Sequence, residues 1–287
     1  MFQDALKDAQ VRVQAALDAA MSDLEGTIAE AMRYTCQGGK RLRAFLAMES
    51  ARLHGVEPDQ ADRVAAAIEA IHAYSLVHDD LPCMDDDDLR RGNPTVHIKW
   101  DEAVAVLTGD ALQTLAFDIL SDRRTGDAEI QAALVSTLAK ASGAQGMVLG
   151  QMLDIEAETA GSPLNLEQIT RLQAGKTGAL IEWSACAGAI MARADPAPLR
   201  QYAQALGLAF QIADDILDIE GDAEKAGKRL QKDEDAGKAT FVSLLGLEGA
   251  KVRAKSLVEE AEAALAPYGE EAHNLKAAAR FVISRDA

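Results

Sequence analysis

The sequence predicts an all-α protein, and three observations lead to this prediction. The chain has 287 residues, of which 48% are hydrophobic and 4% aromatic, with 7 prolines. A β-sandwich or barrel would require more β-branched and aromatic residues. Apolar residues recur at helical spacing along most of the chain. Neither an internal repeat nor a linker interrupts it, so we expect one domain over residues 1–287, a single large bundle of about ten or more helices.

The net charge and the cysteines limit the function classes. A net charge of −17 argues against binding to nucleic acid or to an anionic membrane surface. Cys36, Cys83 and Cys186 are isolated, with neither disulfide nor zinc spacing, which fits a reducing compartment. The N-terminus lacks the apolar core of a signal peptide, and no uncharged run reaches the roughly 18 residues of a membrane span. We therefore expect a soluble, cytoplasmic protein without a membrane span.

The first elements are amphipathic helices followed by a basic turn. Residues 4–34 carry apolar side chains at helical spacing and form one or two helices. Two glycines break this pattern, and Lys40 and Arg43 open the next helix, 44–53. Amide groups at a helix N-terminus favour anions, so these two cations form a candidate anion site. A solvated basic turn is the alternative for this segment taken alone.

The apolar helix 60–77 leads into a first acidic cluster. Residues 72–94 contain six aspartates and two arginines. Carboxylates this close repel one another, and the energy rises steeply as they leave water. Oxygen-only ligands indicate a hard cation, Mg²⁺ first, shared with a substrate phosphate; the alternative is a solvated acidic loop. Pro82 ends or distorts the helix, which lets Asp85 come back toward Asp79.

Cations and a histidine accompany this cluster. Arg90 and Arg91 are placed to hold phosphate oxygens in forked hydrogen bonds. His72 lies seven residues before Asp79, so both residues lie on nearly the same helix face, about 10 Å apart along the axis. His72 is therefore a candidate phosphate donor, although a lone histidine is usually a structural residue.

The middle of the chain is also predicted to be helical. Its helices cover residues 103–120, 128–142, 143–158 and 165–191. In the last of these, Lys176 and Thr177 are flanked by glycines, which indicates a local backbone distortion and another anion contact. Gln151 and Asp154 are either outer polar groups of the same site or helix-packing residues.

A second acidic cluster ends the apolar helix 199–219. Gln211, Asp214 and Asp218 lie one turn apart on one helix face, and Asp215 adjoins them. Two such clusters, each at the end of a buried helix, favour a metal site over a decorated surface. The chain closes with a basic segment containing Lys228, Arg229, Lys232 and Lys238, and with covering helices at 241–247, 249–265 and 270–282.

This ordered set of motifs resembles the short-chain trans-prenyl diphosphate synthases over nearly the whole chain. The resemblance rests on Gly-Gly-Lys40-Arg-Leu-Arg43, His72, Asp79-Asp80-x4-Asp85 with Arg90-Arg91-Gly, Thr108-Gly-Asp, Gly-Lys176-Thr177-Gly, Gln211-x2-Asp214-Asp215-x2-Asp218, Gly-Lys228 and Gly-Lys238-x-Thr240. It implies an α-helical bundle in which the two acidic motifs face each other across a central cavity. It also implies that three Mg²⁺ ions, for which Mn²⁺ can substitute, are shared with an allylic diphosphate.

The resemblance implies a role for each matching residue. The direct metal ligands are Asp79, Asp85 and Asp214, and the outer or water-mediated partners are Asp80, Asp215 and Asp218. The allylic diphosphate contacts are Arg90, Lys176, Thr177, Gln211, Lys228 and Lys238. The isopentenyl diphosphate contacts are Lys40, Arg43, His72 and Arg91. The candidate catalytic residues are Asp79, Asp85, Arg90, Lys176, Asp214 and Lys228.

The implied reaction is a head-to-tail condensation of isopentenyl diphosphate with dimethylallyl and geranyl diphosphates. Metal and cations neutralise the departing diphosphate, which itself takes the proton, so the absence of an obvious side-chain base is consistent with this chemistry. An apolar cavity protects the allylic cation from water, and the basic segment 221–240 is the candidate lid. Members of the family pair through long apolar helices, so a homodimer is expected.

The product expected is farnesyl diphosphate (C15), with geranylgeranyl diphosphate (C20) as the alternative. Tyr74 lies five residues before Asp79, roughly 7.5 Å deeper along the helix, and with Ser75 is the candidate chain-length determinant. An aromatic residue here, together with the insertion inside the first motif, is typical of the C15 enzymes. The competing interpretation is that Tyr74 is an ordinary core residue. Three positions depart from the family pattern: Ala44 and Val242 replace prolines, and Gln231 replaces a glycine in the expected lid.

Two other functions share parts of this pattern. A terpene cyclase also ionises an allylic diphosphate, but its second motif is not so rich in aspartate, and the Lys40, Arg43 and His72 group would have no use there. A non-catalytic partner subunit would keep the fold with degenerate aspartate motifs, whereas both motifs are intact here.

Overall fold

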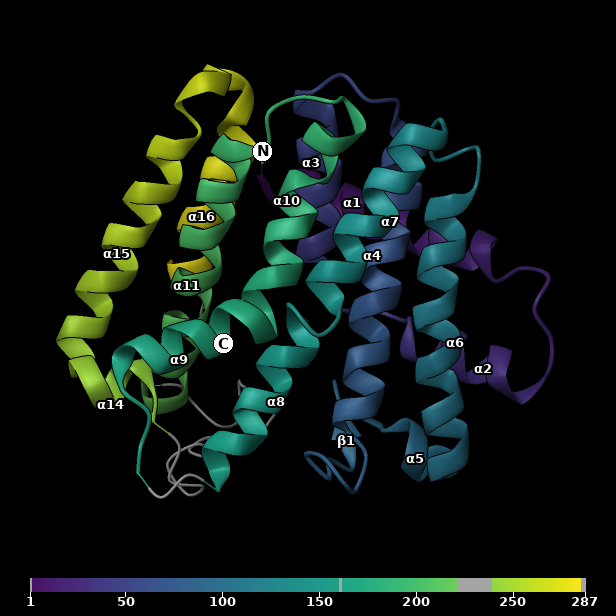
Figure 1. Ribbon diagram of the computed structural model, residues 1–287, viewed down its shortest axis with the longest axis horizontal. Helices are drawn as coiled ribbons and strands as arrows, with labels where there is room; N and C mark the ends of the chain where they lie inside the picture. Colours follow the sequence, from purple (N-terminus) through teal and green to yellow (C-terminus); the bar gives the residue numbers. More distant parts are fainter. Residues whose placement is uncertain (1, 160–161, 221–238, 285–287) are drawn as a thin grey trace. The chain divides into compact units, whose positions relative to one another are not determined.

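The computed structural model describes residues 2–159, 162–220 and 239–284, which are almost entirely helical (Figure 1). The first elements are α1 (Phe2–Ala20), α2 (Gly26–Thr35), α3 (Leu42–Leu53), α4 (Pro58–Asp79), β1 (Leu89–Arg90), β2 (Asn93–Pro94), α5 (Val96–Lys99) and α6 (Glu102–Ser121). Next are α7 (Ala128–Ser142), α8 (Met147–Glu158), α9 (Leu166–Gln173), η1 (Ala174–Gly178), α10 (Ala179–Met191) and α11 (Ala197–Glu220). The last are α14 (Phe241–Leu245), α15 (Leu247–Ala264), η2 (Ala266–Ala272) and α16 (His273–Ser284). The predicted all-α fold is confirmed.

Backbone contacts divide the chain into two compact units. The first contains Gln3–Ser136 and Ala187–Ala194, and the second contains Phe2, Thr137–Cys186 and Asp195–Ala287. The division falls inside α7 and α10, so no linker separates the units in the sequence. The single domain over 1–287 stays a prediction, and each unit is described by itself.

In the first unit, α4 is the central helix. It packs on α3 and on α6, and α4 and α6 lie side by side in Figure 1. Buried residues, mostly alanine and isoleucine, lie on nearly all sides of this helix. Pro58 is its first residue, where an amide hydrogen would have no partner within the helix, so the proline costs nothing there. Because α4 is surrounded along its length, its C-terminal end presents the aspartates from a rigid support.

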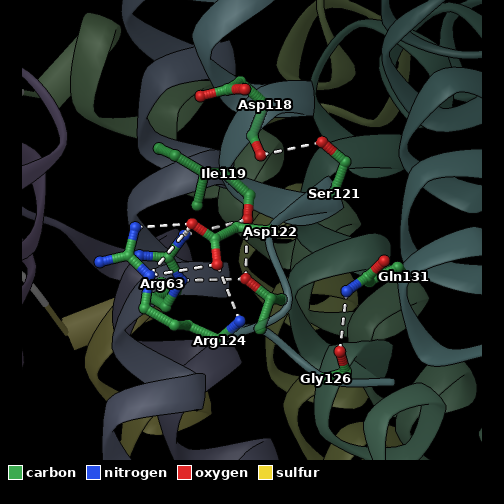
Figure 2. A network of polar contacts seen from close by, with 9 residues as sticks. Arg63, Asp118, Ile119, Ser121, Asp122, Arg124, Gly126 and Gln131 are labelled. Carbon is green, nitrogen blue, oxygen red and sulfur yellow. Dashed lines mark hydrogen bonds and ion pairs between the residues drawn. The ribbon is translucent and has the colours of Figure 1, made fainter. Parts of the chain in front are cut away.

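A polar network secures the other half of α4 (Figure 2). Arg63 of α4 donates its Nε proton to Thr125 Oγ1 at 3.0 Å and forms an ion pair with Asp122, just after α6, at 3.1 Å. Arg124 also binds Asp122, at 2.6 Å. Hydrogen bonds from Arg124, and then the charge of Arg63, hold the pKa of Asp122 well below its usual value. The network fixes the end of α6 to α4. It involves the first half of α4, whereas the first acidic cluster follows the C-terminal end of that helix.

In the second unit, α11 packs chiefly on α15 and also contacts α16 and η1. Tyr202 of α11 is fully buried and donates its hydroxyl proton to Leu275 O at 2.8 Å, which satisfies the phenol inside the apolar interface with α16. The two long helices α11 and α15 are seen side by side in Figure 1. This packing supports the helix that carries the second acidic cluster.

Several predicted element boundaries were wrong. The helix expected from residue 143 begins at Met147. The helix expected over 165–191 contains, as predicted, a backbone distortion at Lys176, the π-helical turn η1. The helix expected from residue 270 is a 3₁₀ turn, η2, followed by α16. The strands β1 and β2 form an antiparallel pair that helical periodicity did not indicate.

Among the described helices, α6 is the only one whose length and hydropathy would suffice to cross a membrane. It nevertheless carries Glu102, Asp110 and Asp118, so the observation that no uncharged run reaches span length still holds. Within the first unit 39% of its most apolar window is buried. Val106 and Leu107 are exposed, which leaves a short apolar strip of two adjacent side chains on α6.

Candidate active site

The first acidic motif turns back on itself at the end of α4. The helix ends at Asp79, and the amide of Asp85 donates to the carbonyl of Asp79 at 2.8 Å. Asp86 adopts a left-handed conformation with φ +51°, and its amide donates to Leu81 O. The expected return of Asp85 to Asp79 is therefore confirmed, and the two residues share one end of the helix.

Asp80 and Arg90 form a close pair within this motif. Arg90 donates from Nε at 2.7 Å and from Nη2 at 2.5 Å to the same oxygen of Asp80, which is 3% exposed. Burial raises the pKa of Asp80, and the hydrogen bonds and charge of Arg90 oppose that effect. Sequence reasoning assigned Asp80 to the metal and Arg90 to a diphosphate, whereas the structure pairs them with each other. Asp80 thus orients Arg90.

The β1–β2 pair positions Arg91. Arg90 pairs with Asn93 across the two strands, and Arg91 occupies the turn between them with φ +53°. The Arg91 guanidinium donates to Gln37 O at 3.2 Å and lies against Gly39, where an added Cβ would stand 2.7 Å from Nη1. Glycine is favoured at position 39 because its backbone has φ +92°, a conformation that residues with a side chain rarely adopt.

Arg43 and His72 meet between α3 and α4. Their side chains approach to 3.4 Å, from Arg43 Nη1 to His72 Nε2. Burial, and then the charges of Arg43 and Arg91, lower the pKa of His72 well below its usual value. The ring is therefore neutral at pH 7, with Nε2 accepting from the arginine. Arg43 Nε is buried without a hydrogen-bond partner among the residues that the structure describes, which is a favourable donor for an incoming anion.

The two chain-length candidates, Tyr74 and Ser75, lie on α4 about one helical turn before Asp79. Tyr74 is 5% exposed, and its ring meets His78 edge-on with centroids 5.7 Å apart. Its buried hydroxyl has no hydrogen-bond partner in the described part of the chain. Burial raises the pKa of Tyr74, and the nearby Gln113 side chain partly offsets this. Ser75 donates its hydroxyl proton to His72 O at 2.9 Å and so is occupied with its own helix.

A π-helical turn carries the Lys176–Thr177 pair in the second unit. The turn η1 covers Ala174–Gly178, which confirms the expected backbone distortion. Lys176 Nζ donates to Asp154 of α8 at 2.6 Å, and Asp154 is 8% exposed. Gly150 of α8 permits this approach, because an added Cβ would stand 2.0 Å from the Lys176 amide nitrogen. Asp154, which sequence reasoning left between two roles, is the partner of Lys176.

The second acidic motif occupies the C-terminal part of α11. Asp214 and Asp218 share one face, as predicted from their spacing. Asp215 accepts a hydrogen bond from the Phe241 amide at the start of α14, at 2.6 Å. Gln211 donates to Gln173 Oε1 at 2.8 Å, next to η1. Asp215 and Gln211 therefore both have protein partners.

The donor set fits a hard cation. The side chains at both helix ends are carboxylates with neighbouring amides, which suit Mg²⁺ rather than a softer metal. The described residues contain no ready group of three His, Cys, Asp or Glu ligands. Mg²⁺ commonly takes only one or two carboxylates and completes its shell with water and phosphate oxygens, so the two short clusters are chemically adequate.

Some predicted residues lie outside the described part of the chain. These are Lys228, Gln231 and Lys238, with most of the expected lid segment 221–240. Sequence reasoning also missed Arg41 and Glu69, a buried ion pair. A glutamate inside an otherwise apolar helix was the signal that pointed to it.

Comparisons with known proteins show which family this chain is similar to. The polyprenyl synthetase family model matches residues 25–277. The farnesyl diphosphate synthase of Haemophilus influenzae is 44% identical over 99% of this chain and 98% of its own length. That of Escherichia coli is 47% identical over 90% of this chain and 89% of its own. The crystal structure of an FPP/GFPP synthase from Zymomonas mobilis has a TM-score of 0.89 at 45% identity, covering 98% of both chains.

Proposed function

Because this chain belongs to the polyprenyl synthetase family, we propose that it is a Mg²⁺-dependent prenyltransferase that makes farnesyl diphosphate. It condenses isopentenyl diphosphate with dimethylallyl diphosphate and then with geranyl diphosphate. The observation that carries the proposal is the structure of the first motif, where Asp85 returns to Asp79 beside an oriented arginine. A second carboxylate pair, Asp214 and Asp218 on one face of α11, is proposed to supply further oxygen ligands.

Asp79, Asp85 and Asp214 would hold the metal ions. Asp80 supports them through Arg90, and Asp215 and Asp218 contribute from α11. Bound there, Mg²⁺ neutralises the charge that develops on a departing diphosphate. Mn²⁺, which has a similar preference for oxygen ligands, is expected to substitute. The number of metal ions in the family pattern, three, belongs to the proposal.

The proposed allylic diphosphate contacts are hydrogen-bond donors from several segments of the chain. Lys176 and Thr177 reach it from the π-helical turn, where Asp154 fixes the lysine. Gln211 adds an amide from α11, and Arg90 adds a guanidinium held by Asp80. Lys228 and Lys238 are proposed to complete this group, with segment 221–240 acting as the lid. As the C1–O bond breaks, these donors bind the leaving oxygens and so lower the barrier to ionisation.

Isopentenyl diphosphate is held by Lys40, Arg43, His72 and Arg91. The neutral His72 ring accepts from Arg43 and thereby aims the guanidinium. The double bond of isopentenyl diphosphate then forms the new C–C bond with C1 of the allylic cation. The diphosphate that left takes a proton from C2 of the unit that came from isopentenyl diphosphate. The electrons of that C–H bond form the new double bond and neutralise the carbocation. No side-chain base is required.

The strip on α6 is proposed to be the homodimer interface. Val106 and Leu107 are 42% and 53% exposed on a helix that is apolar on most sides. A second copy of the same strip would cover them symmetrically. A cytoplasmic location is also proposed, because the isolated cysteines fit a reducing compartment.

Turnover with labelled isopentenyl diphosphate, dimethylallyl diphosphate and Mg²⁺ tests the proposed function. The expected product is C15, measured by chromatography after phosphatase treatment. A C20 product would replace the farnesyl assignment with a geranylgeranyl one. Hydrocarbon released from farnesyl diphosphate alone would indicate a cyclase, and no turnover at all would indicate a non-catalytic subunit. Asp79→Ala should abolish condensation while the circular dichroism spectrum stays helical.

A further inference from the structure

Arg41 and Glu69 form an ion pair in the interior of the first unit. Arg41 Nη1 donates to Glu69 Oε2 at 2.9 Å, and the two residues are 6% and 2% exposed. Arg41 Nη2 also donates to Gln14 Oε1 at 2.9 Å and to the carbonyl of Cys36. The guanidinium thus makes three hydrogen bonds to protein atoms. It differs in this from Arg43, two residues later, whose Nε lacks a partner among the described residues.

Glu69 holds the start of α3 directly. Its second oxygen accepts from the Ala44 amide at 3.1 Å, one of the amides that a helix N-terminus leaves without an intrahelical partner. Arg41 precedes α3 in a left-handed conformation, with φ 54° and ψ 32°. A non-glycine residue keeps that conformation only where surrounding contacts determine it. The contacts of Arg41 and Glu69 are therefore what fixes the turn between Lys40 and Arg43.

Glu69 is also the counter-charge of the surrounding cations. It lies one helical turn before His72 on α4, which places it beneath the predicted isopentenyl diphosphate group. Burial lowers the pKa of Arg43 and of Arg91, and the negative charge of Glu69 partly offsets this lowering. A buried ion pair contributes little net stability compared with apolar residues of the same volume, so its position under these cations calls for another explanation.

We propose that Arg41 and Glu69 are positioning residues, which do not touch substrate but hold Lys40 and Arg43 in place for the diphosphate of isopentenyl diphosphate. This inference rests on the proposed function. It divides the basic motif at the start of α3 into two residues that bind substrate, Lys40 and Arg43, and one that builds the turn, Arg41.

The test measures KM for both substrates in two variants. Glu69→Gln removes the charge and keeps the shape, so KM for isopentenyl diphosphate should rise about tenfold, the effect of one weakened charge-assisted hydrogen bond. KM for geranyl diphosphate should change by less than about twofold. Arg41→Met combined with Glu69→Leu replaces the pair by apolar side chains, and the pair itself contributes little net stability. It also leaves the Ala44 amide and the Cys36 carbonyl without these partners, so the melting temperature should fall while the chain still folds. Its KM for isopentenyl diphosphate should stay raised.

Asp122→Asn is the matched control. It weakens the ion pair that Asp122 forms with Arg63, and Arg63 lies on α4, the helix that also carries Glu69. It should lower the melting temperature slightly and leave both KM values unchanged. Calorimetric titration with isopentenyl diphosphate, without turnover, should repeat the order of affinities. A double variant with wild-type KM for isopentenyl diphosphate, or Glu69→Gln raising both KM values equally, would overturn the positioning role. Wild-type protein that binds no isopentenyl diphosphate would instead overturn the proposed function.

Discussion

At the scale of single residues, Tyr74 of α4 is the proposed determinant of product length. It is buried one helical turn and more before the aspartates, beside His78. If its ring is the floor of the prenyl chain's pocket, its removal must let the chain grow further. The alternative, a core tyrosine without a role in length, predicts only a loss of stability.

Tyr74→Ala is expected to shift the product from C15 to C20 or longer, measured as the chain-length distribution at fixed substrate ratio. Tyr74→Phe is the matched control, since it keeps the ring and removes only a hydroxyl without a partner among the described residues. The control should keep C15, because the aromatic ring that would form the floor stays in place. Unchanged C15 from the alanine variant would show that Tyr74 is core.

His72 makes stability depend on pH. Its folded-state pKa lies well below the usual value because of burial and the nearby arginines. The unfolded chain therefore binds a proton at a pH where the folded chain does not, so stability falls as the pH drops below about 6.5. The loss continues until the folded-state pKa is reached, with a slope of at most about 1.4 kcal/mol per pH unit.

His72→Gln should flatten this slope. The measurement is urea denaturation at pH 7.5, 6.5 and 5.5, each analysed for the free energy of unfolding. His273→Gln changes an exposed histidine and should leave the slope as in the wild type. An equal slope in the wild type and in the His72 variant would contradict the pKa direction.

At the scale of elements, the contact of α8 with η1 determines where Lys176 lies. Gly150→Ala would place a methyl group 2.0 Å from the Lys176 amide, so the two elements must separate. We expect a loss of about 1–3 kcal/mol in unfolding free energy. We also expect at least roughly tenfold lower kcat/KM for the allylic substrate, because the lysine leaves Asp154.

Gly207→Ala is the control for that substitution. A Cβ at Gly207 would meet its nearest neighbour at 3.5 Å, an ordinary van der Waals distance, within the helix α11. It should keep activity and gain a little stability from the better helix former. Comparable losses in both variants would mean that the close contact at Gly150 is not the cause.

The elements also show how far the sequence could be interpreted. The ends of α4 and the distortion at Lys176 were predictable, because proline and glycine act on the backbone next to them. The pairing of Asp80 with Arg90, ten residues apart, was not, because it depends on the short β1–β2 strands that bring the chain back. Arg41 and Glu69, 28 residues apart, are likewise joined only by the packing of α3 on α4.

At the scale of the whole molecule, the apolar strip of α6 is the expected contact between copies. Leu107→Asp would bury a charge opposite itself in a symmetric interface and should convert a dimer into 30.5 kDa monomers. Sedimentation or light scattering would measure the mass. Val252→Asp changes a 70% exposed valine of α15 and should leave the mass as in the wild type. A dimer that persists with Leu107→Asp would place the interface elsewhere.

The net charge of −17 sets a further condition for the whole molecule, because diphosphates approach against that field. The arginines and lysines at the ends of α4 and before α3 must reverse it locally. Composition predicted this conflict, and it predicted the helical class. It gave no indication of which side chains in each motif bind a ligand and which bind other protein groups.

The hydrogen bond between Asp215 and the Phe241 amide gives one acidic side chain two competing uses. If Asp215 turns toward a metal ion, the first amide of α14 loses its acceptor, and a helix of five residues has few other bonds to retain it. Filling the ion site would then loosen a neighbouring turn, and emptying it would tighten that turn again. Occupancy would thus be communicated along the backbone by the loss or return of a single hydrogen-bond acceptor.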